Sequence, residues 1–210
     1  MIESSSTAYS GEPALTVLEM IRRSAPRIEK TVNLPLAVQA SLQSSFAYVA
    51  REAGREDLAK DLARRSVTRA DKSGEPDPRV ISRQTLAEIS LRLGQCPEAI
   101  HLFNEADALL ASARPRLKPL QLNGYFIARA NVKSRCEANP QAAVELYQQA
   151  ATIQGISSMS AAATAVGLAL ELARLGRNTE AVQVVERGLS ASRQDLEARY
   201  FEVALKRILS

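Results

Sequence analysis

Apolar residues recur at three- and four-residue spacing along most of this chain, the pattern of amphipathic helices that bury one face. In residues 35–53 the apolar stripe consists of Val38, Leu42, Phe46 and Val49. Gly54 ends that stretch, and a second stripe follows with Leu58, Ala59, Leu62 and Val67. Runs of β-branched residues with period-two alternation, which favour strands, are missing. The pattern therefore predicts helices joined in pairs by short glycine turns.

The same glycine-to-alanine spacing returns farther along the chain, as Gly54–Ala59, Gly94–Ala99 and Gly176–Ala181. A fourth copy lacks the glycine but keeps Ala143, Leu146, Tyr147 and Ala150, which align with Ala99, Leu102, Phe103 and Ala106. The alanines Ala59, Ala99, Ala143 and Ala181 lie 40, 44 and 38 residues apart. Self-similarity at such a period is typical of repeat arrays. We expect an all-α, right-handed superhelical solenoid of about four helix pairs.

Proline and glycine breaks suggest how the chain divides. We expect a flexible leader at 1–12 and one helical domain over 13–210, consisting of a lead-in helix at 13–33, helix pairs at about 35–74, 78–113, 115–155 and 156–192, and a capping helix at 194–209. Pro26 should kink or split the lead-in helix. The segment 161–172 is apolar on most faces and needs a cover, which the capping helix can supply. Alternatively, Val166, Leu170 and the final helix form a homodimer interface.

Composition agrees with a helical, tightly packed core. The chain has 210 residues, of which 46% are hydrophobic and 4% aromatic, and it has no Trp. No apolar run reaches the roughly 18 residues of a membrane-spanning helix, and the serine-rich start with Glu3 does not resemble a secretory signal. A complete chain is expected in the cytoplasm, and a segment excised from a membrane-anchored regulator is expected outside it.

Cys96 and Cys136 fall at or near the helix-to-helix turns of consecutive pairs. The interpretation we favour is two unpaired thiols. Such turns lie close together on one edge of a solenoid, however, so the alternative is a disulfide that closes a loop of about 40 residues. That disulfide would require an oxidising compartment.

Sequence motifs for catalysis are not found. The chain has neither GxGxxG nor GxxxxGK[ST], and its one histidine, His101, is expected to face solvent. We therefore expect no enzyme activity, no cofactor and no metal site. Direct nucleic-acid binding is also not expected, because a net charge of +4 is small for a phosphate binder and aromatic residues are few.

The glycine–alanine spacing, Phe103 and Tyr147 four residues after the alanine, and Ala106 and Ala150 beyond them resemble tetratricopeptide repeats (TPRs). The period is nearer 40 than the 34 of that family, and its first-helix Trp is absent. The stretch 13–67 is similar to the helical repeats of bacterial Hanks-type Ser/Thr kinases, and related repeats follow winged-helix domains in transcriptional regulators. The resemblance implies a scaffold that binds other macromolecules.

In TPR proteins the first helix of each pair lines a concave groove, and the resemblance implies which residues face it here. Counting from the turn glycines, and aligning Ala128 with Ala47 and Ala87, assigns to the groove Ser44, Tyr48, Arg51, Gln84, Glu88, Arg92, Tyr125, Arg129 and Lys133. Arginine can hold a carboxylate with two hydrogen bonds, and tyrosine adds contact area at low entropic cost. We therefore expect an acidic or C-terminal segment of a protein partner to bind there.

Charge along the chain is uneven, which supports the groove but has a second interpretation. Residues 114–135 contain cations and no acids, namely Arg114, Arg116, Lys118, Arg129, Lys133 and Arg135, whereas 95–113 and 136–173 contain acids and no Lys or Arg. The basic segment is either part of a peptide groove or simply complementary to its acidic neighbours. The hypothesis is a non-catalytic protein-interaction module. The alternative is a regulatory segment of a larger signalling protein that binds a ligand or self-associates.

Overall fold

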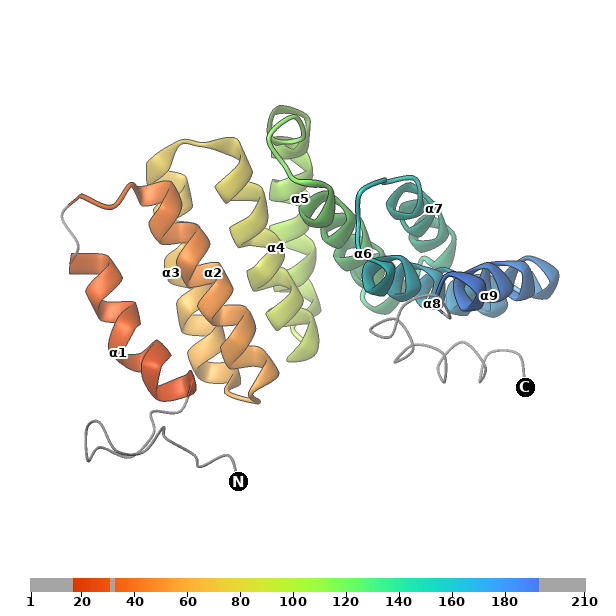
Figure 1. Ribbon diagram of the computed structural model, residues 1–210, viewed down its shortest axis with the longest axis horizontal. Coiled ribbons are helices and arrows are strands. Elements are labelled where there is room, and N and C mark those ends of the chain that lie inside the picture. The colour runs from red at the N-terminus through yellow and green to blue at the C-terminus, as the bar shows by residue number, and fades with distance from the viewer. Residues whose placement is uncertain (1–16, 31–32, 193–210) are drawn as a thin grey trace, which may run out of the picture.

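Helices make up the described part of the chain, which in this computed structural model comprises residues 17–30 and 33–192 (Figure 1). The predicted leader at 1–12 and capping helix at 194–209 lie outside these residues. The helices are α1 (Val17–Lys30), α2 (Leu36–Glu52), α3 (Glu56–Ser73), α4 (Pro76–Arg92), α5 (Cys96–Ala113), α6 (Pro119–Arg135), α7 (Pro140–Ala151), α8 (Ser158–Arg174) and α9 (Asn178–Ser192).

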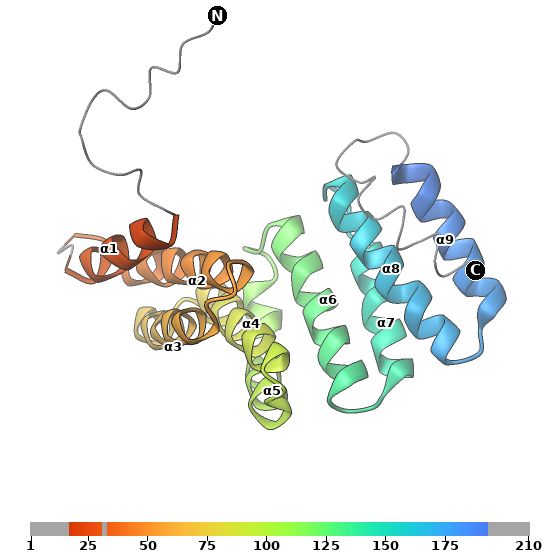
Figure 2. The ribbon, with the colours of Figure 1, turned by 90° about the horizontal axis from the view of Figure 1, so that it is seen from below.

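Consecutive helices pack in pairs, α2 with α3, α4 with α5, α6 with α7 and α8 with α9. The pairs follow one another along an arc (Figure 2), so the predicted all-α solenoid is confirmed. Three turns inside the pairs contain a glycine with positive φ: 70° at Gly54, 73° at Gly94 and 73° at Gly176. A residue with a Cβ is strained in that conformation, which explains why glycine recurs there.

The core is built largely from alanine at the places where two helices cross. The four alanines that define the repeat, Ala59, Ala99, Ala143 and Ala181, are all buried. Phe103 and Tyr147 are buried beside them. Because alanine is small, the helix axes can approach closely, which is how an aromatic-poor sequence still forms a dense interior.

Tyr147 illustrates how closely neighbouring pairs pack. A Cβ added to Gly167 of α8 would lie 2.3 Å from Cε1 of the Tyr147 ring, so the ring occupies the space of the missing side chain. The Tyr147 hydroxyl donates a hydrogen bond to the Asn131 side-chain carbonyl at 2.9 Å, and burial raises the pKa of Tyr147 to about 12. Gly167 is therefore required by packing between α7 and α8.

The structure narrows two expectations from the sequence. Pro26 lies inside α1, which continues to Lys30, so the helix is not split at that residue, and a kink there stays a prediction. Cys96 at the start of α5 and Cys136 at the end of α6 form a disulfide with Cα atoms 5.3 Å apart, so the structure has the bonded alternative where we favoured free thiols. The disulfide links the second helix of one pair to the first helix of the next. None of the helices in 17–30 and 33–192 has the length and apolar character needed to cross a membrane.

Candidate functional site

The first helices of the pairs form the inner row of the arc. Neighbouring first helices contact one another, α2 with α4, α4 with α6 and α6 with α8, in addition to contacting their own second helices. Helices that meet along the row lie on the shorter side of the curve, and their partners spread along the outer side. The concave face is thus the face of α2, α4, α6 and α8.

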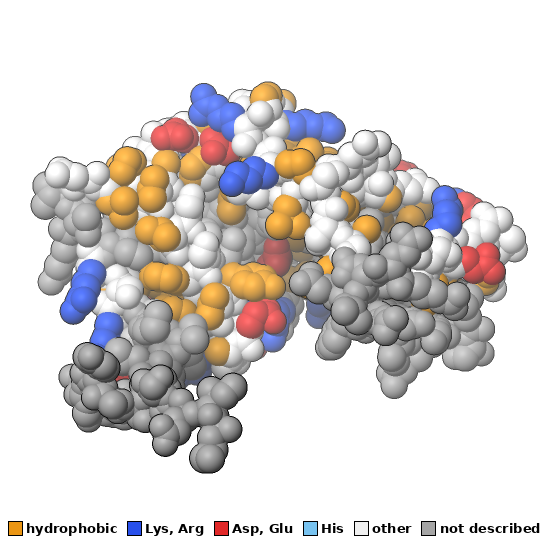
Figure 3. All heavy atoms as spheres, viewed as in Figure 1, with side chains coloured by type: hydrophobic (Ala, Val, Ile, Leu, Met, Phe, Trp, Pro, Cys, Tyr) orange, Lys and Arg blue, Asp and Glu red, His pale blue; other side chains and the backbone are white. Residues whose placement is uncertain are grey.

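Exposed apolar side chains concentrate on this inner row. Among the described residues, seven of the eight large hydrophobic side chains that are exposed belong to first helices: Leu36, Val38, Leu42, Tyr48, Leu120, Met159 and Leu170. The eighth is Val182 on α9. Figure 3, viewed from the same side as Figure 1, shows hydrophobic side chains gathered over α2 on this face. Exposed apolar side chains gathered on one face mark interaction sites in many proteins.

Five residues predicted for the groove come together where α2 meets α4. Arg51 lies over the ring of Tyr48, with Cζ 4.4 Å from the ring centroid, and its Nη1 donates to Glu88 Oε2 at 2.7 Å. Gln84 Nε2 donates to the other oxygen of Glu88 at 2.8 Å. Arg92 Nη1 lies 3.7 Å from Glu52 Oε1, and Glu52 also accepts from Arg51 Nε at 3.0 Å.

The charged groups of this cluster pair with one another, and part of the cluster is exposed to solvent. Burial acts to lower the pKa of Arg51, but the charges and hydrogen bonds of Glu88 and Glu52 outweigh burial and raise that pKa above its usual value. The Arg51 side chain is 12% exposed, whereas Arg92 is 47% exposed and Tyr48 53%. The accessible groups of the cluster are therefore Tyr48, Arg92 and Glu52, which is 52% exposed, and Arg51 and Glu88 support them from below.

Tyr125 and Arg129 do not join that cluster, because both are buried between α5 and α6. Tyr125 donates a hydrogen bond to Asp107 and packs edge-on against Phe103, with ring centroids 5.6 Å apart. Arg129 reaches Asp107 at 3.0 Å and Glu137 at 3.2 Å. These side chains join two pairs and do not present free groups to the concave face.

A shift in register explains the difference. Ser66 Oγ donates to the Ala40 carbonyl, seven residues before Ala47, and Asn123 Nδ2 donates to the Ala150 carbonyl of α7. Ser66 and Ala150 each lie seven residues after the repeat alanine of their own helix, Ala59 or Ala143. Asn123 therefore corresponds to Ala40, and Ala130 corresponds to Ala47.

The alignment that placed Ala128 beside Ala47 is thus wrong by two residues. Two residues of helix correspond to about 200° of rotation, which turns the predicted groove residues of α6 toward α5. In the corrected register the inner face of α6 carries Ile127 and Asn131 at the positions of Ser44 and Tyr48. The only sequence signal for the shifted register of α6 was the missing glycine in the turn between α6 and α7. Ala138 has the positive φ in that turn, which is one residue longer than the glycine turns.

The two remaining residues predicted for the groove, Lys133 and Ser44, already contact polar groups of neighbouring residues. Lys133 Nζ lies 2.6 Å from Glu137, four residues on, and Ser44 is buried with its hydroxyl 2.8 Å from that of Ser66. His101 is exposed as expected, with Nε2 3.6 Å from Glu105. In the part of the chain that the structure describes, no group of three or more His, Cys, Asp or Glu side chains is placed to hold a metal ion.

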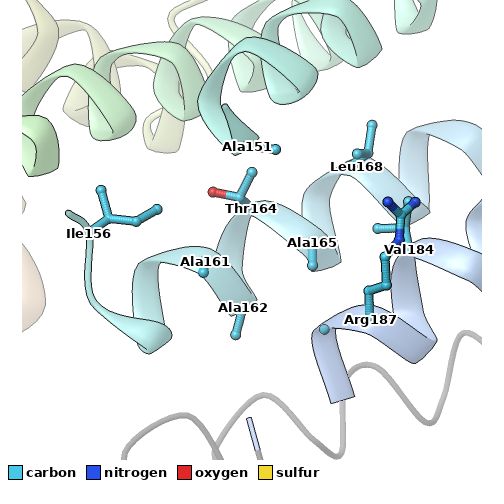
Figure 4. Close-up of a pocket in the computed structure, with 10 residues that line it drawn as sticks. Ala151, Ile156, Ala161, Ala162, Thr164, Ala165, Leu168, Val184 and Arg187 are labelled. Atoms are coloured by element: carbon cyan, nitrogen blue, oxygen red, sulfur yellow. The ribbon is translucent and has the colours of Figure 1, made fainter. Parts of the chain in front are cut away.

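A second surface lies at the other end of the array, between α8, α9 and the end of α7. There a hollow of about 230 Å³ is lined mainly by small apolar side chains, and its polar lining residues are Thr164 and Arg187 (Figure 4). Its lining residues are Ala151, Ile156, Ala161, Ala162, Thr164, Ala165, Leu168, Val184, Arg187 and Gly188. The apolar character of 161–172 is evident from the sequence, whereas this hollow is not.

Comparison with known proteins supports the fold and does not identify a function. The sequence matches no protein-family model and no curated protein. Among solved structures it is similar to a Podosopora anserina protein assigned as a kinesin light chain with nearly identical TPR-like repeats, at 22% identity and a TM-score of 0.60, over 84% of this chain and 86% of that one. A point variant of that protein gives a TM-score of 0.62 at 22% identity, over 84% and 85%. The chain therefore has a TPR-like repeat fold.

Proposed function

We propose that this chain is a non-catalytic protein-interaction module that binds a segment of a partner protein on its concave face. The observation that carries the proposal is the concentration of exposed apolar side chains on the first helices, seven of eight among the described residues. Helical repeat arrays use extended concave surfaces in this way, which supports the proposal by analogy of fold.

The binding surface we propose centres on Tyr48 and Arg92. Tyr48 is half exposed and held flat by Arg51, so it offers contact area with little further ordering. Arg92 is separated from Glu52 by more than a hydrogen-bond distance, so a carboxylate of the partner can pair with it. Arg92 is the residue that best supports a partner with an acidic segment, since Arg51, Arg129 and Lys133 already have carboxylate partners at 3.2 Å or less.

The experiment is affinity capture from an extract of the source cells, with three forms of the chain as bait. Tyr48→Glu introduces a charge on the inner row, and Val182→Glu makes the same type of change at a similarly exposed apolar residue of α9. We expect a partner that is retained by the original chain and by Val182→Glu but lost with Tyr48→Glu. A partner retained equally by all three would contradict the concave site, and the absence of any retained partner would contradict the interaction module.

A second candidate is a regulatory segment of a larger signalling protein, which binds a small ligand or self-associates. The apolar hollow beside α8 and α9 is the observation that favours it, because a concave apolar surface suits a hydrophobic ligand or the helix of a second copy. A dimer through the C-terminal helices would use the same region. Leu168→Arg, which places a charge in the hollow, should abolish ligand binding or self-association in this case and leave partner capture unchanged.

A further inference from the structure

The junction between the second and third helix pairs is packed less closely than the junctions on either side of it. The second helix of one pair makes extensive contacts with the first helix of the next in α3 with α4 and in α7 with α8. At the middle junction, only a few residue pairs of α5 and α6 lie close to each other. Long side chains bridge the two helices there, as in the edge-on contact of Phe103 with Tyr125.

Polar groups provide much of the contact between α5 and α6, and solvent reaches part of them. The Tyr125 hydroxyl donates a hydrogen bond to Asp107. Arg129 Nη2 lies 3.0 Å from Asp107 Oδ2 and donates to Asn104 Oδ1 at 3.0 Å. The Asp107 side chain is 41% exposed, so water can replace its partners when the helices separate. These contacts therefore oppose separation of α5 and α6 only moderately.

Two covalent connections within the described residues join α5 to α6, and they lie at opposite ends of α5. The chain itself runs from the end of α5 to the start of α6 through residues 114–118. The disulfide joins Cys96, the first residue of α5, to Cys136, which directly follows α6. Because α5 has 18 residues, the two connections are about 27 Å apart along its axis. The disulfide thus prevents a rotation of α6 about 114–118 that a single connection permits.

The disulfide is not enclosed in the core. Cys96 and Cys136 are both half-buried, and they lie at helix ends beside the turns that precede α5 and follow α6. A small dithiol can therefore approach the disulfide while the chain remains folded, and access of this kind is a condition for thiol–disulfide exchange.

We infer that the bond between Cys96 and Cys136 is a redox-sensitive clamp on a hinge formed by residues 114–118. A thiolate of a dithiol reductant attacks one sulfur and the other leaves as a thiolate; the second thiolate of the reductant then displaces the mixed disulfide. The cysteine pair gains two electrons and two protons, and the reductant becomes a disulfide. Helices α6 to α9 then turn relative to α1 to α5, which changes the spacing of α4 and α6 on the concave face. The inference goes beyond the proposed interaction function, and its test needs no partner.

Trypsin can measure the opening of the hinge, because residues 114–118 contain a single bond that it cuts. Arg114 and Lys118 each precede a proline, which trypsin does not accept, so the bond after Arg116 remains. Leu117, on the other side of that bond, packs against the hydrophobic core. Cleavage after Arg116 therefore requires local opening, and its rate reports how often the hinge opens.

The comparison is between the original chain and Cys96→Ser/Cys136→Ser, both without reductant. We expect the variant to be cut after Arg116 about tenfold faster, because its hinge opens more often. Cleavage after Arg177, in the turn between α8 and α9, is the internal control and should keep its rate. Circular dichroism should show unchanged helix content, and small-angle X-ray scattering should show a larger radius of gyration.

Reduction of the original chain tests the redox step without a substitution. Dithiothreitol in the absence of denaturant should reduce the bond, and iodoacetamide should then modify Cys96 and Cys136, which mass spectrometry detects. After removal of the reagents, this protein should be cut after Arg116 as fast as the serine variant.

Three results would overturn the inference, each in its own way. Equal cleavage rates after Arg116 with and without the disulfide would refute the hinge. Faster cleavage after both Arg116 and Arg177, with loss of helix content, would show that the disulfide stabilises the whole chain and does not clamp one junction. A bond that dithiothreitol reduces only in urea would refute redox sensitivity of the folded protein.

Discussion

The guanidinium of Arg129 lies 3.0 Å from the carboxylate of Asp107, across the junction between the second and third helix pairs. The same guanidinium lies 3.2 Å from Glu137 and 5.5 Å from the centroid of the Phe103 ring. With its side chain 6% exposed, Arg129 connects α5, α6 and the following turn. A cation assigned to a binding groove from the sequence thus lies between two repeats and contacts both.

Replacing Arg129 should therefore affect stability first. Arg129→Met removes the partner of Asp107 and Glu137, which are 41% and 23% exposed, so water replaces part of the lost interaction. We expect the free energy of unfolding to fall by about 1 to 3 kcal/mol. Lys133→Met removes a partly exposed pair between the last turn of α6 and Glu137 in the turn that follows, and should cost less than about 1 kcal/mol. Urea denaturation of both variants measures the difference. Equal small losses would show that the Arg129 contacts contribute little.

Gly167→Ala tests the close packing of α7 on α8. Alanine normally stabilises a helix relative to glycine, but here its Cβ would overlap the Tyr147 ring. We expect a loss of about 1 to 3 kcal/mol from overpacking. Gly124→Ala in α6 is the matched control, since its nearest neighbour is the end of the Gln84 side chain at 3.5 Å, and it should gain up to about 1 kcal/mol. In a Tyr147→Leu background the penalty at Gly167 should largely disappear.

The disulfide between Cys96 and Cys136 should hold the second and third pairs together. It spans 40 residues, for which loop-closure entropy gives a stabilisation of about 3 to 4 kcal/mol. Thermal unfolding with and without reductant should show that difference in the original chain and none in a Cys96→Ser/Cys136→Ser variant. Thiol titration of the unfolded, unreduced protein should detect no free cysteine. Two free thiols would contradict the bond.

Asp71 should make the protein sensitive to acid. Burial alone would raise the pKa of Asp71, but hydrogen bonds and charges of Arg83 and Arg79 outweigh it and hold that pKa below its usual value. A carboxylate with a lowered pKa stabilises the folded state at neutral pH, and this contribution is lost as the pH falls below about 4. Asp71→Asn should thus lower the melting temperature at pH 7 and flatten its dependence on pH in the acid range.

Asp61→Asn is the control for that measurement, because Asp61 forms an exposed pair with Arg65 within α3. Its melting temperature should change little and its acid dependence should match the original chain. If Asp71→Asn and Asp61→Asn behave alike, the contacts of Asp71 with Arg83 do not contribute to acid sensitivity.

The local sequence pattern was sufficient to predict the helix pairs and part of the residue cluster between α2 and α4. The glycines at 54, 94 and 176 and the buried alanines after them could be recognised because a left-handed turn and a helix crossing each restrict the residue to a few types. Where the glycine was present, counting back from it placed Tyr48, Arg51, Glu88 and Arg92 in one cluster. Where it was absent, before α7, the count slipped by two residues and pointed at the wrong face of α6.

The amino-acid sequence by itself determined that the chain forms paired helices with alanine crossings, since periodicity and turn chemistry act over a few residues. Tertiary structure alone decided which arginine is buried between repeats, that Cys96 meets Cys136, and that Val38 and Leu42 remain uncovered. An apolar stripe shows that a helix has a face to bury. Whether a neighbour covers that face depends on which other helices are present and how they stack. On α2, Val38 and Leu42 stay exposed although α1, α3 and α4 all contact that helix.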